Sequence, residues 1–109
     1  MYYFTWRSPV RDGKLKSFHT RELPFVFDYV DLDEAMTGTG QDPNTLADKI
    51  SSAWVAFVRS GNPNQKGLPN WPSFDNSQRA TMIFNYECKI VNDPNGEELR
   101  ALRAIRAAT

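Results

Sequence analysis

The only histidine of the chain, His19, is the side chain best suited to proton transfer. An imidazole has an ordinary pKa near neutrality, so it can accept a proton and return it under physiological conditions. His19 follows a strand-like run and a turn signal at residues 11–13, in a segment typical of a loop, where catalytic groups are often presented. Taken alone, however, a single histidine is more often a structural or surface residue.

A nucleophile to partner this histidine is not evident. Serine hydrolases of one large class place the serine on a strained strand-to-helix turn with the pattern Gly-x-Ser-x-Gly, and that pattern does not occur here. The available serines stand in helix or loop contexts: Ser8, Ser17, Ser51, Ser52, Ser60, Ser73 and Ser77. A complete catalytic triad within the chain is therefore not expected.

The other reactive side chains favour structural roles. Cys88 lies in a strand-like run and is predicted to be a small core residue. One cysteine and one histidine cannot complete a zinc site of four protein ligands. An acidic stretch lacks the glycine and closing glutamate of a calcium loop and is predicted to be solvated: Asp28, Asp31, Asp33 and Glu34. We expect no metal and no organic cofactor.

Composition narrows the possible partners. Lys and Arg total 13, as do Asp and Glu, so the formal net charge is zero and general nucleic-acid binding is disfavoured. No apolar run approaches the roughly 20 residues that a membrane span needs. The 109 residues are interpreted as one soluble segment without an internal linker or repeat.

The rest of the chain divides into elements that must position His19. Residues 2–7 form an aromatic run typical of a buried strand, and residues 22–27 allow only a short helical turn because Pro24 restricts the residue before it. Residues 28–44 are interpreted as a surface loop. Two short apolar runs, 79–85 and 88–92, predict a hairpin. A last helix is expected from residue 93. Its apolar side carries Leu99, Leu102 and Ile105, and its solvent-exposed side carries Arg100, Arg103 and Arg106.

The clearest prediction is a helix over about 44–60. Its apolar stripe has helical spacing and consists of Leu46, Ile50, Trp54 and Phe57. Two N-caps are possible, Thr45 with Asp48 as a capping box or Asp42 before Pro43, and Gly61 gives the stop. Trp54 and, from the loop at 62–78, Trp71 are predicted to be core residues.

The N-terminal third carries an excess of aromatic side chains. Eight of the chain's aromatic residues fall within the first 29 positions, more than so short a chain easily buries. We therefore expect a partner to cover the first strand around Tyr2, Phe4 and Trp6. That partner is a second copy of the chain or a missing N-terminal portion.

The histidine segment also carries a family resemblance. Residues 17–27, SFHTRELPFVF, resemble the histidine loop of type-B carboxylesterases, the family of the cholinesterases and para-nitrobenzyl esterases. Further similar stretches follow in the family's order: LAD at 46–48, SAWVAF at 52–57, GNPN at 61–64, LPNWP at 68–72 and RATMIF at 79–84. The similarity extends over about residues 2–103. One departure is Lys16-Ser17, where the family often has Gly-Ala.

The resemblance implies the C-terminal part of an α/β-hydrolase fold: strand, histidine loop, long helix, hairpin and terminal helix. As an isolated chain this is a small α+β unit. The resemblance further implies hydrolysis of small-molecule carboxylic esters by a full-length enzyme, with His19 as the triad histidine and the serine and acid in the absent part. The 109 residues alone are then expected to be inactive.

Two other interpretations remain open on sequence. The chain can be a non-enzymatic module that self-associates through its aromatic first strand. It can also be a small domain that binds a hydrophobic ligand through Phe18, Phe25 and Phe27.

Overall fold

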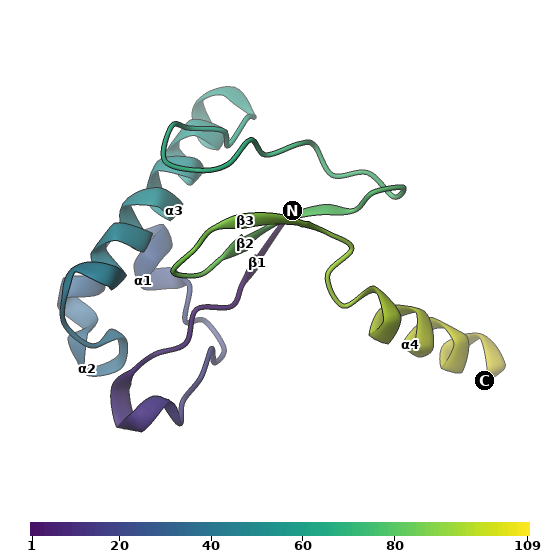
Figure 1. Ribbon diagram of the computed structural model, residues 1–109, viewed down its shortest axis with the longest axis horizontal. Helices are drawn as coiled ribbons and strands as arrows, with labels where there is room; N and C mark the ends of the chain where they lie inside the picture. Colours follow the sequence, from purple (N-terminus) through teal and green to yellow (C-terminus); the bar gives the residue numbers. More distant parts are fainter.

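A three-stranded sheet lies at the centre of the computed structural model, which describes residues 1–109 (Figure 1). The strands are β1 (Tyr2–Phe4), β2 (Ala80–Phe84) and β3 (Lys89–Asn92), in the order β1-β2-β3. β1 runs parallel to β2, with Tyr3 opposite Ile83, and β3 runs antiparallel to β2. The predicted hairpin is confirmed. Every residue of β2 is buried, Thr81 included, and β2 is the central strand of the sheet.

The long helix α3 spans Gln41–Ser60 and begins three residues before the predicted start at 44. Both proposed N-caps are wrong, because Gly40 occupies the cap position at φ 115° without a side-chain cap bond. The predicted stop is confirmed. Gly61 adopts a left-handed conformation at φ 76°, and its N–H donates to the Phe57 carbonyl at 2.7 Å.

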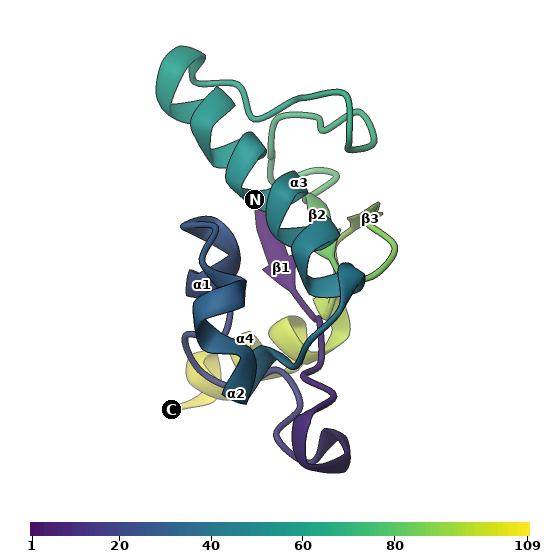
Figure 2. The same cartoon turned by 90° about the vertical axis from the view of Figure 1, so that its left-hand side faces the viewer.

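The core lies between one face of the sheet and the helices α3 and α1 (Leu23–Val26) (Figure 2). α3 contributes Leu46, Ile50 and Ala53, which follow a spacing of four and three residues. Trp54 is adjacent to that row and is 37% exposed, so its prediction as a core residue is wrong. Its ring packs edge-on against Tyr2 at 6.2 Å instead. Trp71 is buried, as predicted.

The N-terminal aromatic residues build this core rather than an exposed surface. Trp6 and Phe25 are completely buried, with ring centroids 5.0 Å apart, and Phe4 packs on Phe25 at 5.2 Å. Trp6 is therefore unavailable to a partner, contrary to the expectation from composition. On β1 only Tyr3 is largely exposed, at 45%.

The segment predicted as a surface loop over 28–44 is more ordered than expected. It contains the 3-10 turn η2 (Val30–Asp33) and the single-turn helix α2 (Glu34–Thr37). Buried Thr37 fixes this segment, because its hydroxyl donates to the carbonyls of Asp33 at 2.9 Å and Val30 at 3.1 Å. Upstream, a further 3-10 turn, η1, spans Val10–Gly13.

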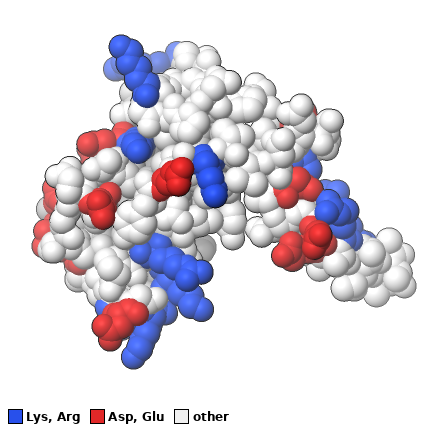
Figure 3. Space-filling model, in the orientation of Figure 1, with Lys and Arg blue, Asp and Glu red and all other residues white.

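The last helix, α4 (Gly96–Ala108), projects away from the rest of the molecule (Figure 1). It begins three residues after the predicted start at Asp93. Its apolar side chains are not part of the core, since Leu102 is 48% and Ile105 63% exposed. None of the helices has the length and apolar character of a membrane span. Figure 3 shows acidic and basic side chains near one another in a few places, while most of the face shown carries neither.

Candidate functional site

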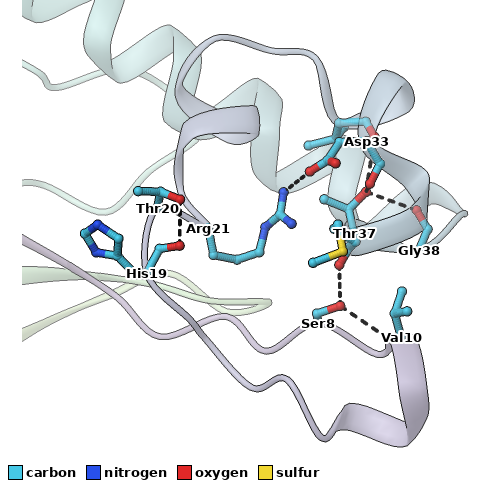
Figure 4. Close-up of polar contacts among 10 residues, drawn as sticks. Ser8, Val10, His19, Thr20, Arg21, Asp33, Thr37 and Gly38 are labelled. Carbon is cyan, nitrogen blue, oxygen red and sulfur yellow. Dashed lines mark hydrogen bonds and ion pairs between the residues drawn. The ribbon is translucent and has the colours of Figure 1, made fainter.

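His19 lies in the exposed loop between η1 and α1. Neither ring nitrogen has a hydrogen-bond partner within the chain, and Figure 4 shows the ring directed away from Ser8, Arg21 and Asp33. No serine and no carboxylate of the chain contacts the imidazole through a hydrogen bond or ion pair. The ring is thus free to receive partners from outside the chain.

The backbone around His19 forms a tight and strained turn. The N–H of Arg21 donates to the Phe18 carbonyl at 3.1 Å, which places His19 and Thr20 at the two central positions. Thr20 has φ 65°, a conformation that favours glycine and is unusual for a β-branched residue. Lys16, before the turn, has φ 53°. Each such residue costs about 1–3 kcal/mol, so other interactions must hold the loop.

Hydrogen bonds tie this loop to the body of the protein. The hydroxyl of Ser17 donates to the carbonyl of Phe4, at the end of β1, at 3.3 Å. The N–H of Ser8 donates to the Lys16 carbonyl at 3.2 Å, and the Ser8 hydroxyl donates to the Met36 carbonyl. Buried Ser8 therefore links the loop to α2, which is a structural rather than a nucleophilic role.

Arg21 is a buried cation immediately beside the histidine turn. Its side chain is 3% exposed, and its Nη2 donates to the Asp33 carboxylate (Figure 4). The guanidinium also lies over the Phe18 ring, 5.2 Å from the centroid. Its Nε is buried without an acceptor. The sequence predicts a solvated Asp33, whereas the structure pairs it with Arg21. No local pattern links the two residues, because 12 positions separate them.

The remaining predicted site residues have structural environments. Cys88 is buried as predicted, and burial raises the pKa of its thiol, which disfavours the reactive thiolate. No group of three or more His, Cys, Asp or Glu side chains is arranged to hold a metal ion. The three phenylalanines suggested for a hydrophobic ligand do not share a surface, since Phe25 is fully buried, Phe27 is 70% exposed and Phe18 lies beneath Arg21.

The family model described as the carboxylesterase family matches residues 1–102. This chain belongs to the carboxylesterase family. Para-nitrobenzyl esterase from Bacillus subtilis is 38% identical over 104 residues, which cover 94% of this chain and 21% of that enzyme. Phenmedipham hydrolase from Pseudarthrobacter oxydans is also 38% identical, over 93 residues that cover 79% of this chain and 18% of the relative.

Solved structures of esterases share the fold of this carboxylesterase-family chain. An esterase from Clostridium hathewayi has a TM-score of 0.83 at 28% identity and covers 91% of the chain. A para-nitrobenzyl esterase structure has a TM-score of 0.81 at 36% identity and covers 92%. These proteins are α/β-hydrolases, which confirms the predicted fold class. The chain spans about a fifth of their length, 19% and 21% respectively.

Two apolar grooves flank the point where Tyr2 meets Trp54 in this chain. The first, the Trp71 groove, has a volume of about 440 Å³ and is lined by Met1, Tyr2, Ala53, Trp54, Phe57, Pro63, Trp71 and Phe84. The second, the Val58 groove, has about 520 Å³ and is lined by Tyr2, Glu22, Leu23, Val26, Phe27, Ser51, Trp54, Val55, Val58 and Arg59. Exposed apolar surface of this kind is typical of an interface.

Proposed function

We propose that this chain supplies the catalytic histidine of a serine carboxylic-ester hydrolase, with His19 as the general base and general acid. The nucleophilic serine and the triad acid come from polypeptide outside these 109 residues. The substrate is a small-molecule carboxylic ester. The chemistry uses neither a metal nor an organic cofactor.

The reaction divides into two acyl transfers. The imidazole of His19 accepts the serine proton as the serine oxygen attacks the ester carbonyl, and the resulting imidazolium returns that proton to the departing alcohol. An acyl-serine remains. Water then attacks it, His19 takes the water proton, and the proton passes to the serine oxygen as the carboxylic acid leaves. The external carboxylate orients the ring and stabilises its charged form.

One observation carries this proposal: an exposed imidazole with both nitrogens free stands in a loop that is tied to the core, inside the family-matched segment. A histidine that packs in the core would be buried, and one that stabilises local structure would use its ring in a hydrogen bond. His19 does neither, and its place in the family-matched segment favours a catalytic role over that of an ordinary surface residue.

The test is a chimera in which residues 1–102 replace the matching segment of the Bacillus subtilis para-nitrobenzyl esterase. We expect the chimera to hydrolyse p-nitrophenyl acetate. The variant His19→Ala should lower its kcat by at least about a thousandfold with little change in KM or melting temperature. Lys66→Ala, in an exposed loop, is the control. A folded His19→Ala chimera that keeps most of its kcat would show that His19 is not catalytic.

The isolated chain is expected to be inactive, because no serine within it reaches the His19 ring. We expect purified chain to hydrolyse p-nitrophenyl acetate no faster than free imidazole at the same concentration. A serine-directed phosphonate should leave that trace activity unchanged. Faster hydrolysis that the phosphonate abolishes would contradict the proposal, since it would require an internal nucleophile.

We further propose that the apolar side of the chain docks against the remaining four fifths of a carboxylesterase domain. β1 pairs on one edge only, although parallel strands are generally buried within a sheet. Both apolar grooves border β1 through Tyr2. The relatives carry about four times as much additional polypeptide as this match covers. A second copy of the chain is the alternative occupant.

A further inference from the structure

We propose that Arg21 is a positioning residue, which holds His19 in place by clamping both ends of the histidine turn. The inference rests on the proposed function of His19, but the clamp itself is a property of this chain's own residues. Its members are Phe18 and Arg21, the two ends of the turn, and Asp33.

The clamp closes the turn through side chains as well as through the backbone. The backbone bond from Arg21 N–H to the Phe18 carbonyl joins the first and fourth residues of the turn. The guanidinium of the fourth residue covers the ring of the first at 5.2 Å. His19 and Thr20 therefore lie between two residues that contact each other through the backbone hydrogen bond and through the cation–π contact.

The ion pair then attaches this closed turn to the rest of the protein. Asp33 ends η2, and the same segment is held by the buried hydroxyl of Thr37, which donates to the Asp33 and Val30 carbonyls. A guanidinium fixes direction better than an ammonium, because its donors lie in a rigid plane. Arg21 thus fixes the histidine turn relative to η2.

Stability alone does not explain a buried arginine at this position. Desolvation of an ion pair offsets most of its Coulombic attraction, and the Arg21 Nε remains without an acceptor. An apolar side chain of similar length would avoid that unpaired donor. The turn, by contrast, needs an external restraint because Thr20 holds a conformation, φ 65°, that a β-branched residue disfavours.

The chain contains a matched control for this arrangement. Arg79 also lies over a phenylalanine, 5.1 Å from the Phe74 ring centroid, and also pairs with a carboxylate, that of Asp93 at 2.8 Å. That cluster joins β2 to the start of α4 and does not include the histidine turn. Arg21→Met and Arg79→Met therefore remove the same two kinds of interaction at two different places.

The experiment compares these variants in the full 109-residue chain by NMR. The one-bond Cα–Hα coupling of Thr20 is sensitive to the sign of φ. We expect Arg21→Met to shift this coupling toward the average of several conformations and to lower the order parameters of the His19 and Thr20 amides. Arg79→Met should leave these signals unchanged. Arg21→Lys, which keeps the charge but loses the planar face, should give an intermediate change. If Arg21→Met does not fold, Asp33→Asn is a second and milder variant, which weakens the ion pair with Arg21.

The outcomes separate the clamp from a structural role. If Arg21→Met or Asp33→Asn lowers the melting temperature but leaves the Thr20 coupling and His19 order unchanged, the clamp is wrong. If Arg79→Met changes these signals equally, the effect is general loosening and the clamp is again wrong. If the turn responds only to Arg21 and Asp33 while the His19→Ala chimera keeps its kcat, the clamp stands and the proposed function fails.

Discussion

Two residues near the proposed catalytic side chain, Lys16 and Thr20, adopt left-handed backbone conformations that glycine would adopt without strain. Lys16 stands where the family pattern often has glycine, and its φ of 53° lies in the region that glycine favours. Strain close to a functional group persists only where the surroundings impose it. Here the hydrogen bonds of Ser17 and Ser8 and the contacts of Arg21 provide that restraint.

Removing the strain at Thr20 should stabilise the protein. Thr20→Gly removes a left-handed penalty of about 1–2 kcal/mol and adds about 0.5–1 kcal/mol of backbone entropy cost, so the free energy of unfolding should rise by up to about 1.5 kcal/mol. Urea denaturation measures this change. Thr45→Gly, inside α3, is the control and should lower the free energy by a few tenths of a kcal/mol. A clear loss of stability at Thr20 would show that its hydroxyl bond to the His19 carbonyl, at 2.6 Å, outweighs the strain.

At the scale of elements, α4 is joined to the hairpin through one carboxylate. Asp93, the residue after β3, accepts hydrogen bonds from Arg79 Nε at 2.8 Å and from Arg100 Nη1 at 2.9 Å. Gly96 begins the helix beside it, where an added Cβ would lie 2.0 Å from the Asp93 Oδ2. This close approach requires a glycine at position 96, and the helix begins there rather than at Asp93 because Asp93 and Asn95 have left-handed φ values of 50° and 59°.

The contribution of Asp93 to the free energy of unfolding should depend on pH. The hydrogen bond from Arg100 is the largest influence that lowers the pKa of Asp93 below its ordinary value of 3.8, and Arg79 adds to it. A carboxyl with a lowered folded-state pKa stabilises the fold above its unfolded pKa and loses that effect as the pH falls through the folded one. The free energy of unfolding of the wild type should therefore fall more steeply below about pH 4 than that of Asp93→Asn. Parallel curves in urea titrations at several pH values would contradict this expectation.

How much could be predicted differs from element to element. α3 and the hairpin were predicted because their apolar residues repeat with the period of a helix or lie in two short runs around a turn. Trp54 was misplaced because periodicity gives the direction of the apolar face but not its width, and Ala53 takes the central position. η2 and α2 were missed because their anchors, Val30 and Thr37, are single buried residues in a polar stretch. His19 came from chemistry and resemblance, whereas the Arg21–Asp33 pair required the folded chain.

At the scale of the whole molecule, the chain leaves a continuous apolar surface uncovered on the side of β1, α1 and α3. Phe27 is 70% and Val58 78% exposed, and both line the Val58 groove. With Trp54 partly exposed between the two grooves, this surface is larger than isolated apolar residues would make it. A partner that buries it gains about 25 cal/mol for each Å² of apolar area removed from water.

The proposed docking partner leads to a complementation experiment. A Bacillus subtilis para-nitrobenzyl esterase truncated to lack the segment that matches this chain should regain ester hydrolysis when the chain is added. Val58→Asp places a carboxylate in the Val58 groove and should weaken this recovery at least about tenfold, because each tenfold loss of affinity needs only about 1.4 kcal/mol. Lys66→Asp, an exposed substitution away from both grooves, should not weaken it. If the truncated enzyme shows no binding, and sedimentation instead detects a dimer of the chain that Val58→Asp dissociates, the groove belongs to an interface between two copies.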